Sequence, residues 1–122
     1  MVAGAERAVI TGLHGILFTR DAEAVRAFFR DTLGWPHVDA GDGWLIFKTP
    51  PTELAAHPDP EGGRHELFLM CDDIEATVDE LRGRGARIDK PVSDQGFGLI
   101  TYIELPGGGS IGLYQPRHPT AI

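Results

Sequence analysis

The chain has 122 residues, 42% of them hydrophobic, which is enough for one globular domain that buries a core without disulfide bonds. A formal net charge of −7 without a cluster of Lys or Arg argues against nucleic acid as a partner. The single cysteine, Cys71, fits a reducing cytoplasm. No apolar run approaches the roughly 20 residues of a membrane span, and residues 1–7 lack the apolar core of a secretion signal, so we expect a cytoplasmic protein without membrane contact.

The first half is predicted to begin with a strand within residues 9–19, where alternation places His14 on an otherwise apolar face. Asp21 is typical of a helix N-cap, and Gly34 is typical of the residue that ends a helix. Further strands are predicted at residues 37–39, 44–49 and 52–57. The Pro- and Gly-rich loop at 58–63 is the predicted boundary between two halves.

The second half is predicted to repeat this order. A strand at 66–71 leads to a helix that Asp73 caps and Gly83 ends. Further strands are predicted at residues 87–88, 97–105 and 110–115. The three glycines at 107–109 lack the Lys-Ser/Thr of a phosphate-binding loop, so we interpret them as a turn.

An internal repeat relates the two halves at an offset of 52 residues, since Asp73 follows Asp21 and Glu66 follows His14 at that spacing (73 − 21 = 66 − 14 = 52). Each half is therefore predicted to be a βαβββ module, at about 9–58 and 65–116. One helix cannot cover such a sheet on both faces. The expected fold is α+β, with two pseudo-symmetric modules that form a concave, partly open sheet cleft suited to a small ligand.

Four sequence segments together resemble the vicinal oxygen chelate superfamily. This superfamily contains glyoxalases, extradiol dioxygenases, thiol-transfer antibiotic-resistance enzymes and bleomycin-type drug-binding proteins. The segments are Leu13-His14 before a strand ending in Arg20-Asp21, FFRDTLGW at 28–35, DDIEA at 72–76 and LPGGGSIGL at 105–113. The resemblance covers roughly residues 9–116, nearly the whole chain.

The resemblance also implies a site. Metal-dependent members place four ligand positions on the first and last strands of the modules. His14 falls on the first position and Glu66 on the third, whereas the fourth, usually Glu, falls on Gly112, which has no side chain. The second position lies within 52–57, where either Glu53 or His57 would reach inward. The resemblance further implies a homodimer, in some members with halves exchanged between chains.

Two hypotheses on function follow, and the sequence leaves open whether the protein is an enzyme. In the first, His14, His57 and Glu66 bind a divalent Fe, Mn, Ni or Zn ion that chelates a substrate with adjacent oxygens. The protein would then be a metal-dependent lyase or dioxygenase of the glyoxalase or extradiol type, with Tyr114 as substrate contact or acid/base. The alternative is a metal-free small-molecule (drug) binding protein of the bleomycin-resistance type, which the missing ligand at Gly112 favours.

Each candidate ligand also has a purely structural interpretation. His14 would be a buried, hydrogen-bonded histidine or one at a strand end, and His57, next to Pro58, would be a surface residue at a strand end. Glu66 within a strand is harder to explain structurally, because carboxylates are rarely buried without a partner. A discriminating observation is whether the cleft is lined by metal-ligand side chains or by aromatic rings.

Overall fold

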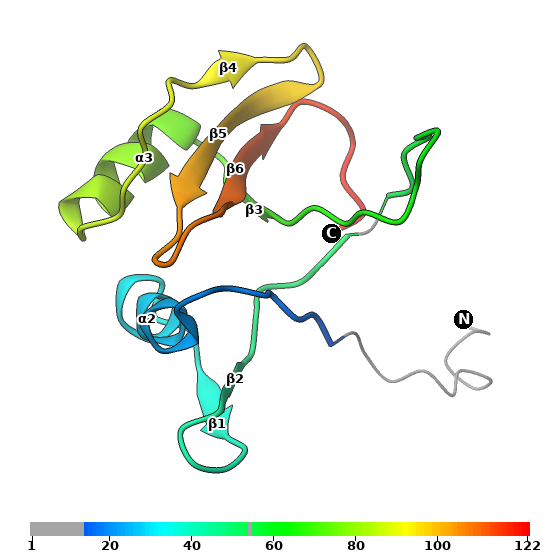
Figure 1. The fold of residues 1–122 in the computed structure, drawn as a ribbon. Coiled ribbons are helices and arrows are strands. Elements are labelled where there is room, and N and C mark those ends of the chain that lie inside the picture. Colours follow the sequence, from blue (N-terminus) through cyan, green and yellow to red (C-terminus); the bar gives the residue numbers. More distant parts are fainter. Residues whose placement is uncertain (1–13, 54) are drawn as a thin grey trace.

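The computed structural model describes residues 14–53 and 55–122, and Figure 1 shows their arrangement. The first half contains α2 (Ala22–Ala27), the π-helical turn η1 (Phe28–Thr32), β1 (His37–Asp39) and β2 (Leu45–Phe47). The second half contains β3 (Phe68–Met70), α3 (Ile74–Gly83), β4 (Ser93–Asp94), β5 (Gly98–Glu104) and β6 (Ser110–Pro116). None of these helices has the length and apolarity needed to cross a bilayer.

The second half forms a βαβββ module, as predicted, but the strand after the helix is β4 at Ser93–Asp94, which pairs with β5. The prediction of a strand at 87–88 is wrong, because Arg87 makes only an isolated bridge to Glu104. Its four strands lie in the order β3-β6-β5-β4, with β3 parallel to β6 and the other pairs antiparallel. The register places Phe68 of β3 and Tyr102 of β5 on either side of Gly112 in β6. Helix α3 connects β3 to β4 and covers one face of this open sheet (Figure 1). The predicted α+β fold class is therefore confirmed.

The hydrophobic core lies between α3 and that sheet. Asp73 caps α3 by accepting a hydrogen bond from the Ala76 amide through Oδ1 at 3.1 Å, as the sequence predicts. The buried side chains come from one face of α3 and from alternate positions of β5 and β6: Ile74, Val78, Leu81, Ile103, Ile111 and Leu113. Because strand side chains alternate, the intervening residues of β5 and β6 must lie on the opposite face, away from α3.

The first half supplies a helix and a two-stranded hairpin. Asp21 caps α2 through its side chain, and Gly34 adopts a positive φ of 71° where the helical segment ends, both as predicted. The Phe29 ring stacks on Trp35 at a centroid distance of 5.1 Å and meets Phe47 of β2 edge-on at 5.4 Å. These aromatic contacts hold the hairpin, which is too short to be stable alone, against the helix.

The two halves meet at the turn between β5 and β6. Phe28 belongs to the core cluster of the second half, and the Thr32 carbonyl accepts a hydrogen bond from the Arg84 guanidinium at 3.2 Å. Gly107 lies so close to Asp21 that a Cβ atom at residue 107 would be 2.8 Å from the Asp21 Cβ and amide nitrogen. The glycine turn thus lets the start of α2 approach the sheet (Figure 1).

Two strand predictions are wrong for the first half. Residues 14–19 and the described residues of 52–57 are not strands, and both are mainly exposed; residues 9–13 and 54 lie outside the described part of the chain. A strand exists only where another strand satisfies its backbone groups, and β1 and β2 pair only with each other. The prolines at 50, 51 and 58 also flank 52–57 and donate no backbone hydrogen bond.

Candidate functional site

The uncovered face of the four-stranded sheet is aromatic. Phe68 of β3 lies 5.9 Å from Tyr114 of β6 and 6.3 Å from Tyr102 of β5, measured between ring centroids. Phe97 and His118 lie beside Tyr114, at 6.2 and 5.7 Å. We call Phe68, Tyr102, Tyr114 and Phe97 the aromatic face, against which the His118 ring lies. The rings of the face come from three strands and one flanking loop and are half-buried or exposed, so they are accessible to a ligand.

Two glycines provide the space in which the rings of the aromatic face lie. A Cβ atom at Gly112 would overlap the Phe68 ring, and one at Gly98 would overlap the Tyr114 ring. Both glycines are buried, although their positions face away from α3, because the rings cover them. A ring that lies across a strand glycine covers backbone that would otherwise be exposed to solvent. The missing side chain at Gly112 therefore has a structural cause.

Tyr114 forms one end of this face. Its hydroxyl group donates a hydrogen bond to the Phe97 carbonyl at 3.3 Å. Partial burial raises the pKa of the Tyr114 phenol above its usual value, and the negative charge of Glu53 raises it further. Tyr114 thus faces the open side of the sheet, as the sequence predicts, and its assignment as a catalytic residue stays a prediction.

Glu53 of segment 52–57 lies near the aromatic face. The Glu53 side chain is half-buried, acts electrostatically on Tyr114 and accepts a hydrogen bond from the Ala121 amide through Oε1 at 2.8 Å. His57 is exposed, and its Nδ1 lies 2.7 Å from the carbonyl oxygen of Pro58.

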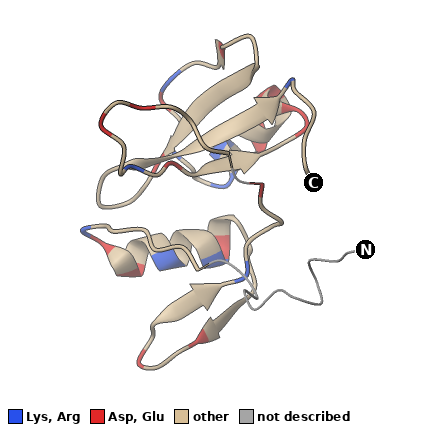
Figure 2. Cartoon of the chain, turned by 90° about the vertical axis from the view of Figure 1, so that its right-hand side faces the viewer, with Lys and Arg blue, Asp and Glu red and all other residues tan. Residues whose placement is uncertain are grey.

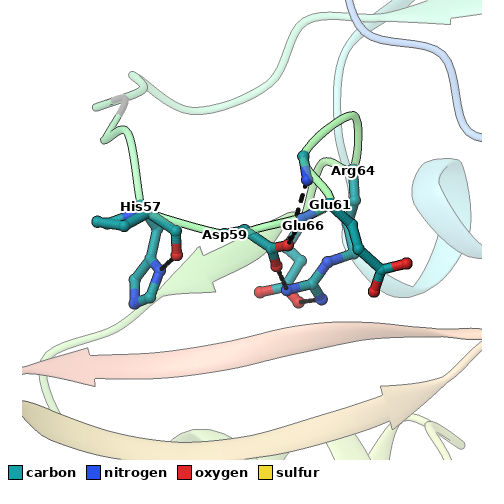
Figure 3. Close-up of polar contacts among 7 residues, drawn as sticks. His57, Asp59, Glu61, Arg64 and Glu66 are labelled. Atoms are coloured by element: carbon teal, nitrogen blue, oxygen red, sulfur yellow. Dashed lines mark hydrogen bonds and ion pairs between the residues drawn. The ribbon is translucent and has the colours of Figure 1, made fainter.

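Glu66 is engaged by an arginine of its own loop. Arg64 Nη1 lies 2.8 Å from Glu66 Oε2, and Arg64 Nη2 lies 3.2 Å from Asp59 Oδ2 (Figure 3). The Glu66 side chain is 55% exposed, so water solvates its charge and no metal ion is needed to balance it. The structural difficulty that the sequence raised for Glu66 is resolved in this way.

The predicted metal ligands are not brought together. His14 is exposed and precedes α2, whereas His57 and Glu66 lie at the two ends of the loop drawn in Figure 3. Within residues 14–53 and 55–122, no group of three or more His, Cys, Asp or Glu side chains is placed to hold a metal ion. The described side chains therefore do not fit a metal centre, and the ligand assignment of these three residues stays a prediction.

The surroundings of the aromatic face are mixed in charge. Figure 2 shows acidic and basic segments interspersed over the ribbon. Lys90 Nζ lies 5.2 Å from the Tyr102 ring centroid, which is a cation–π distance. A surface hollow of about 590 Å³ lies elsewhere and includes none of the predicted site residues. Its lining residues are Phe18, Thr19, Arg20, Gly107, Gly108 and Gly109.

Phe68 and His118 are site residues that the sequence did not reveal. Phe68 shares the parity of Glu66, and Tyr102 shares that of Ile100, so alternation was a usable signal for each strand separately. Phe68 and Tyr102 meet over Gly112 because of the register between β3, β6 and β5, and this register cannot be predicted from the local sequence pattern. His118 follows the last strand and carried no signal.

Comparison with curated proteins finds relatives described as "Putative glyoxylase CFP32" in Mycobacterium bovis and Mycobacterium tuberculosis. Each is 29% identical over 116 residues and covers 84% of this chain. The chain spans 44% of the length of these relatives.

Solved structures share the fold. TnmS3, an antibiotic binding protein from Streptomyces sp. CB03234, has a TM-score of 0.64 and 24% identity, covering 89% of this chain and 98% of its own. A lactoylglutathione lyase from Agrobacterium tumefaciens has a TM-score of 0.57 and 21% identity, covering 88% of this chain and 96% of its own. The family model of the Glyoxalase/Bleomycin resistance protein/Dioxygenase superfamily matches residues 11–113. The chain therefore belongs to this superfamily, as its sequence motifs predict.

Proposed function

We propose that the protein binds a small planar organic ligand on the aromatic face and that this binding needs no metal ion. The observation that carries the proposal is the pair of rings seated over glycines, Phe68 on Gly112 and Tyr114 on Gly98. They create a broad apolar surface around position 112, where metal-dependent members of the superfamily carry a side chain that binds the metal ion.

The chemistry of the face supports a planar ligand. Aromatic rings gain about 0.5–1.5 kcal/mol per pair beyond simple burial when they stack offset or edge-on. The Phe68 ring lies within 6.3 Å of both the Tyr102 ring and the Tyr114 ring, so this part of the face offers several such contacts at once. Polar groups at the margin, among them Glu53 and Lys90, would orient the ligand. The similarity in fold to TnmS3, an antibiotic binding protein, agrees with this function.

A direct test uses the neutral fluorescent probe N-phenyl-1-naphthylamine with metal-free protein in EDTA. We expect saturable fluorescence enhancement for the wild type and a loss of at least about fivefold in affinity for Phe68→Ala, because one ring contact is worth about 1 kcal/mol. Phe18→Ala is the matched control, since Phe18 is 91% exposed and lies outside the aromatic face. Equal probe binding by all three proteins, each shown to be folded by circular dichroism, would exclude the aromatic face as the site.

A metal-dependent lyase or dioxygenase remains the second candidate. It is favoured by the similarity to the mycobacterial relatives described as glyoxylases and to the lactoylglutathione lyase. It is opposed by the donor arrangement described above. Elemental analysis for Fe, Mn, Ni and Zn, on wild-type protein and His14→Ala purified without a chelating tag, tests it. Stoichiometric metal that the substitution removes would favour the enzyme over the binding protein.

We also propose that the protein acts as a homodimer in the cytoplasm. Strand β3 is at the edge of its sheet, and Leu67 and Met70 beside its open backbone are exposed. Ile16 and Phe18, which the repeat relates to Phe68 and Met70, are 63% and 91% exposed. Open strand edges and clustered apolar side chains favour association, and the much longer mycobacterial relatives have room for a second such domain in one chain.

A further inference from the structure

The segment 117–122 is fastened along the end of the aromatic face. The Arg117 amide donates a hydrogen bond to the Phe97 carbonyl at 2.9 Å. The Arg117 guanidinium lies 2.9 Å from both carboxylate oxygens of Asp94, on β4. These contacts fix the direction in which the chain leaves β6 and bring the next residues back over the sheet.

Beyond Arg117, one group of this segment contacts the aromatic face and another contacts the neighbouring Glu53. The His118 ring lies 5.7 Å from the Tyr114 ring, inclined by 33°. The Ala121 amide donates to Glu53 Oε1 at 2.8 Å. The segment therefore presents a planar, nitrogen-containing ring to Tyr114 and an N–H donor to a carboxylate, both within six residues of chain.

We propose that His118 and Ala121 occupy a ligand subsite, which accepts a planar aromatic ring on Tyr114 and a cationic amine on Glu53. Segment 117–122 thus competes with the ligand for one end of the aromatic face. This inference rests on the proposed binding function and adds to it the chemical class of the ligand.

The negative charge of Glu53 makes the subsite selective for a ligand that carries a hydrogen-bond donor. Glu53 is half-buried, and the hydrogen bond that it accepts from Ala121 comes from a neutral amide. A protonated amine in that place forms a charge-assisted hydrogen bond, which is roughly twice as strong as a neutral one. Anionic ligands are disfavoured there, because they would lie against the Glu53 carboxylate.

The affinity of the subsite is limited by the segment that fills it. A ligand must first displace the His118 ring and the Ala121 amide. Its apparent affinity is therefore the intrinsic affinity multiplied by the fraction of molecules in which the segment has left Tyr114 and Glu53. Removing the imidazole ring weakens the closed arrangement and leaves Tyr114 and Glu53 in place. A His118 variant is therefore expected to bind ligand more tightly than the wild type.

Tryptamine and 3-ethylindole are suitable probes, because both carry an indole ring and only tryptamine carries an ammonium group. Their dissociation constants are measured by NMR titration of the full chain for the wild type, Glu53→Gln and His118→Ala. Glu61→Gln is the control, since it removes the same charge from an exposed loop residue. We expect Glu53→Gln to weaken tryptamine about fivefold without changing 3-ethylindole, and His118→Ala to tighten both.

The outcomes separate this inference from the proposed function. The subsite is overturned if tryptamine and 3-ethylindole bind with equal affinity and neither Glu53→Gln nor His118→Ala changes that affinity. If the two probes still perturb the NMR signals of Phe68 and Tyr102 in that case, the aromatic face stands as the binding site. If neither probe binds any variant, including His118→Ala, the aromatic face itself is rejected. If Glu61→Gln weakens tryptamine binding as much as Glu53→Gln does, the effect comes from the net charge of the protein, and the subsite is also overturned.

Discussion

The Phe68 ring lies over the backbone of Gly112, in the space that any larger residue at position 112 would need for its side chain. The two residues are direct partners in the parallel pair β3–β6, so the contact is fixed by strand register. One relationship thus explains both the absence of a side chain at residue 112 and the aromatic character of the open face.

Gly112→Ala is expected to destabilise the protein by about 1–3 kcal/mol, because the added methyl group displaces the Phe68 ring from a packed position. Equilibrium denaturation with urea measures the change. Gly83→Ala is the matched control: Gly83 ends α3 and has no atom within 4 Å of an added Cβ, so this change should be neutral or slightly stabilising. In the background Phe68→Ala the cost of Gly112→Ala should shrink, and full additivity would contradict the proposed overlap.

Asp73→Ala is expected to lower the free energy of unfolding by about 1 kcal/mol, because it removes the side-chain acceptor for the Ala76 amide at the start of α3. The neighbouring change Asp72→Ala removes the same charge from an exposed residue that is not the cap. Thermal and urea denaturation of the two variants should therefore differ. Equal loss in both would show that charge near the helix, and not the cap, is responsible.

The ionisation of Tyr114 should be visible by ultraviolet titration of phenolate absorbance. The chain has two tyrosines, so Tyr102→Phe isolates the signal of Tyr114. We expect a pKa above the usual tyrosine value, caused first by burial and second by the charge of Glu53. Glu53→Gln should lower this pKa part of the way, and an unchanged pKa would place the two groups too far apart to interact.

The same shift predicts a direction for stability. A folded-state pKa above the unfolded value means that the native protein holds the phenolic proton more tightly. This contribution is fully present below the unfolded tyrosine pKa, near 10, and is lost as the pH rises through the folded value. Urea denaturation in the alkaline range should show the loss for Tyr102→Phe and not for Tyr102→Phe combined with Tyr114→Phe.

The proposed dimer should be sensitive to charge on Ile16 and Phe18, the exposed apolar residues that the repeat relates to β3. Phe18→Lys places an ammonium group on a side chain that is 91% exposed, so the monomer should tolerate the change. We expect the molar mass from light scattering to fall from that of two chains to that of one, because burial of the charge at the interface is costly. Val38→Lys, on the hairpin, is the control. A wild-type protein that is already monomeric would contradict the proposal.

Local sequence patterns predicted the elements that depend on local chemistry. Helix α3 follows from the spacing of Ile74, Val78 and Leu81 and from the capping carboxylate of Asp73, all within ten residues. The strands β5 and β6 follow from alternation around a three-glycine turn. The family followed from four such segments in order, and the match to residues 11–113 confirms it.

The same patterns misjudged segment 52–57, and only the tertiary structure showed which of its residues meets the aromatic face. Glu53 and His57 share one strand parity, so alternation could not separate them. In the folded chain Glu53 accepts a hydrogen bond from Ala121, and its charge raises the pKa of Tyr114. The seating of Phe68 on Gly112 was equally hidden, because strands 44 residues apart can pair in several registers with identical local propensity. Sequence thus determined the helices, most of the second-half strands and the family, while long-range register and the return of residues 117–122 decided which side chains share the site.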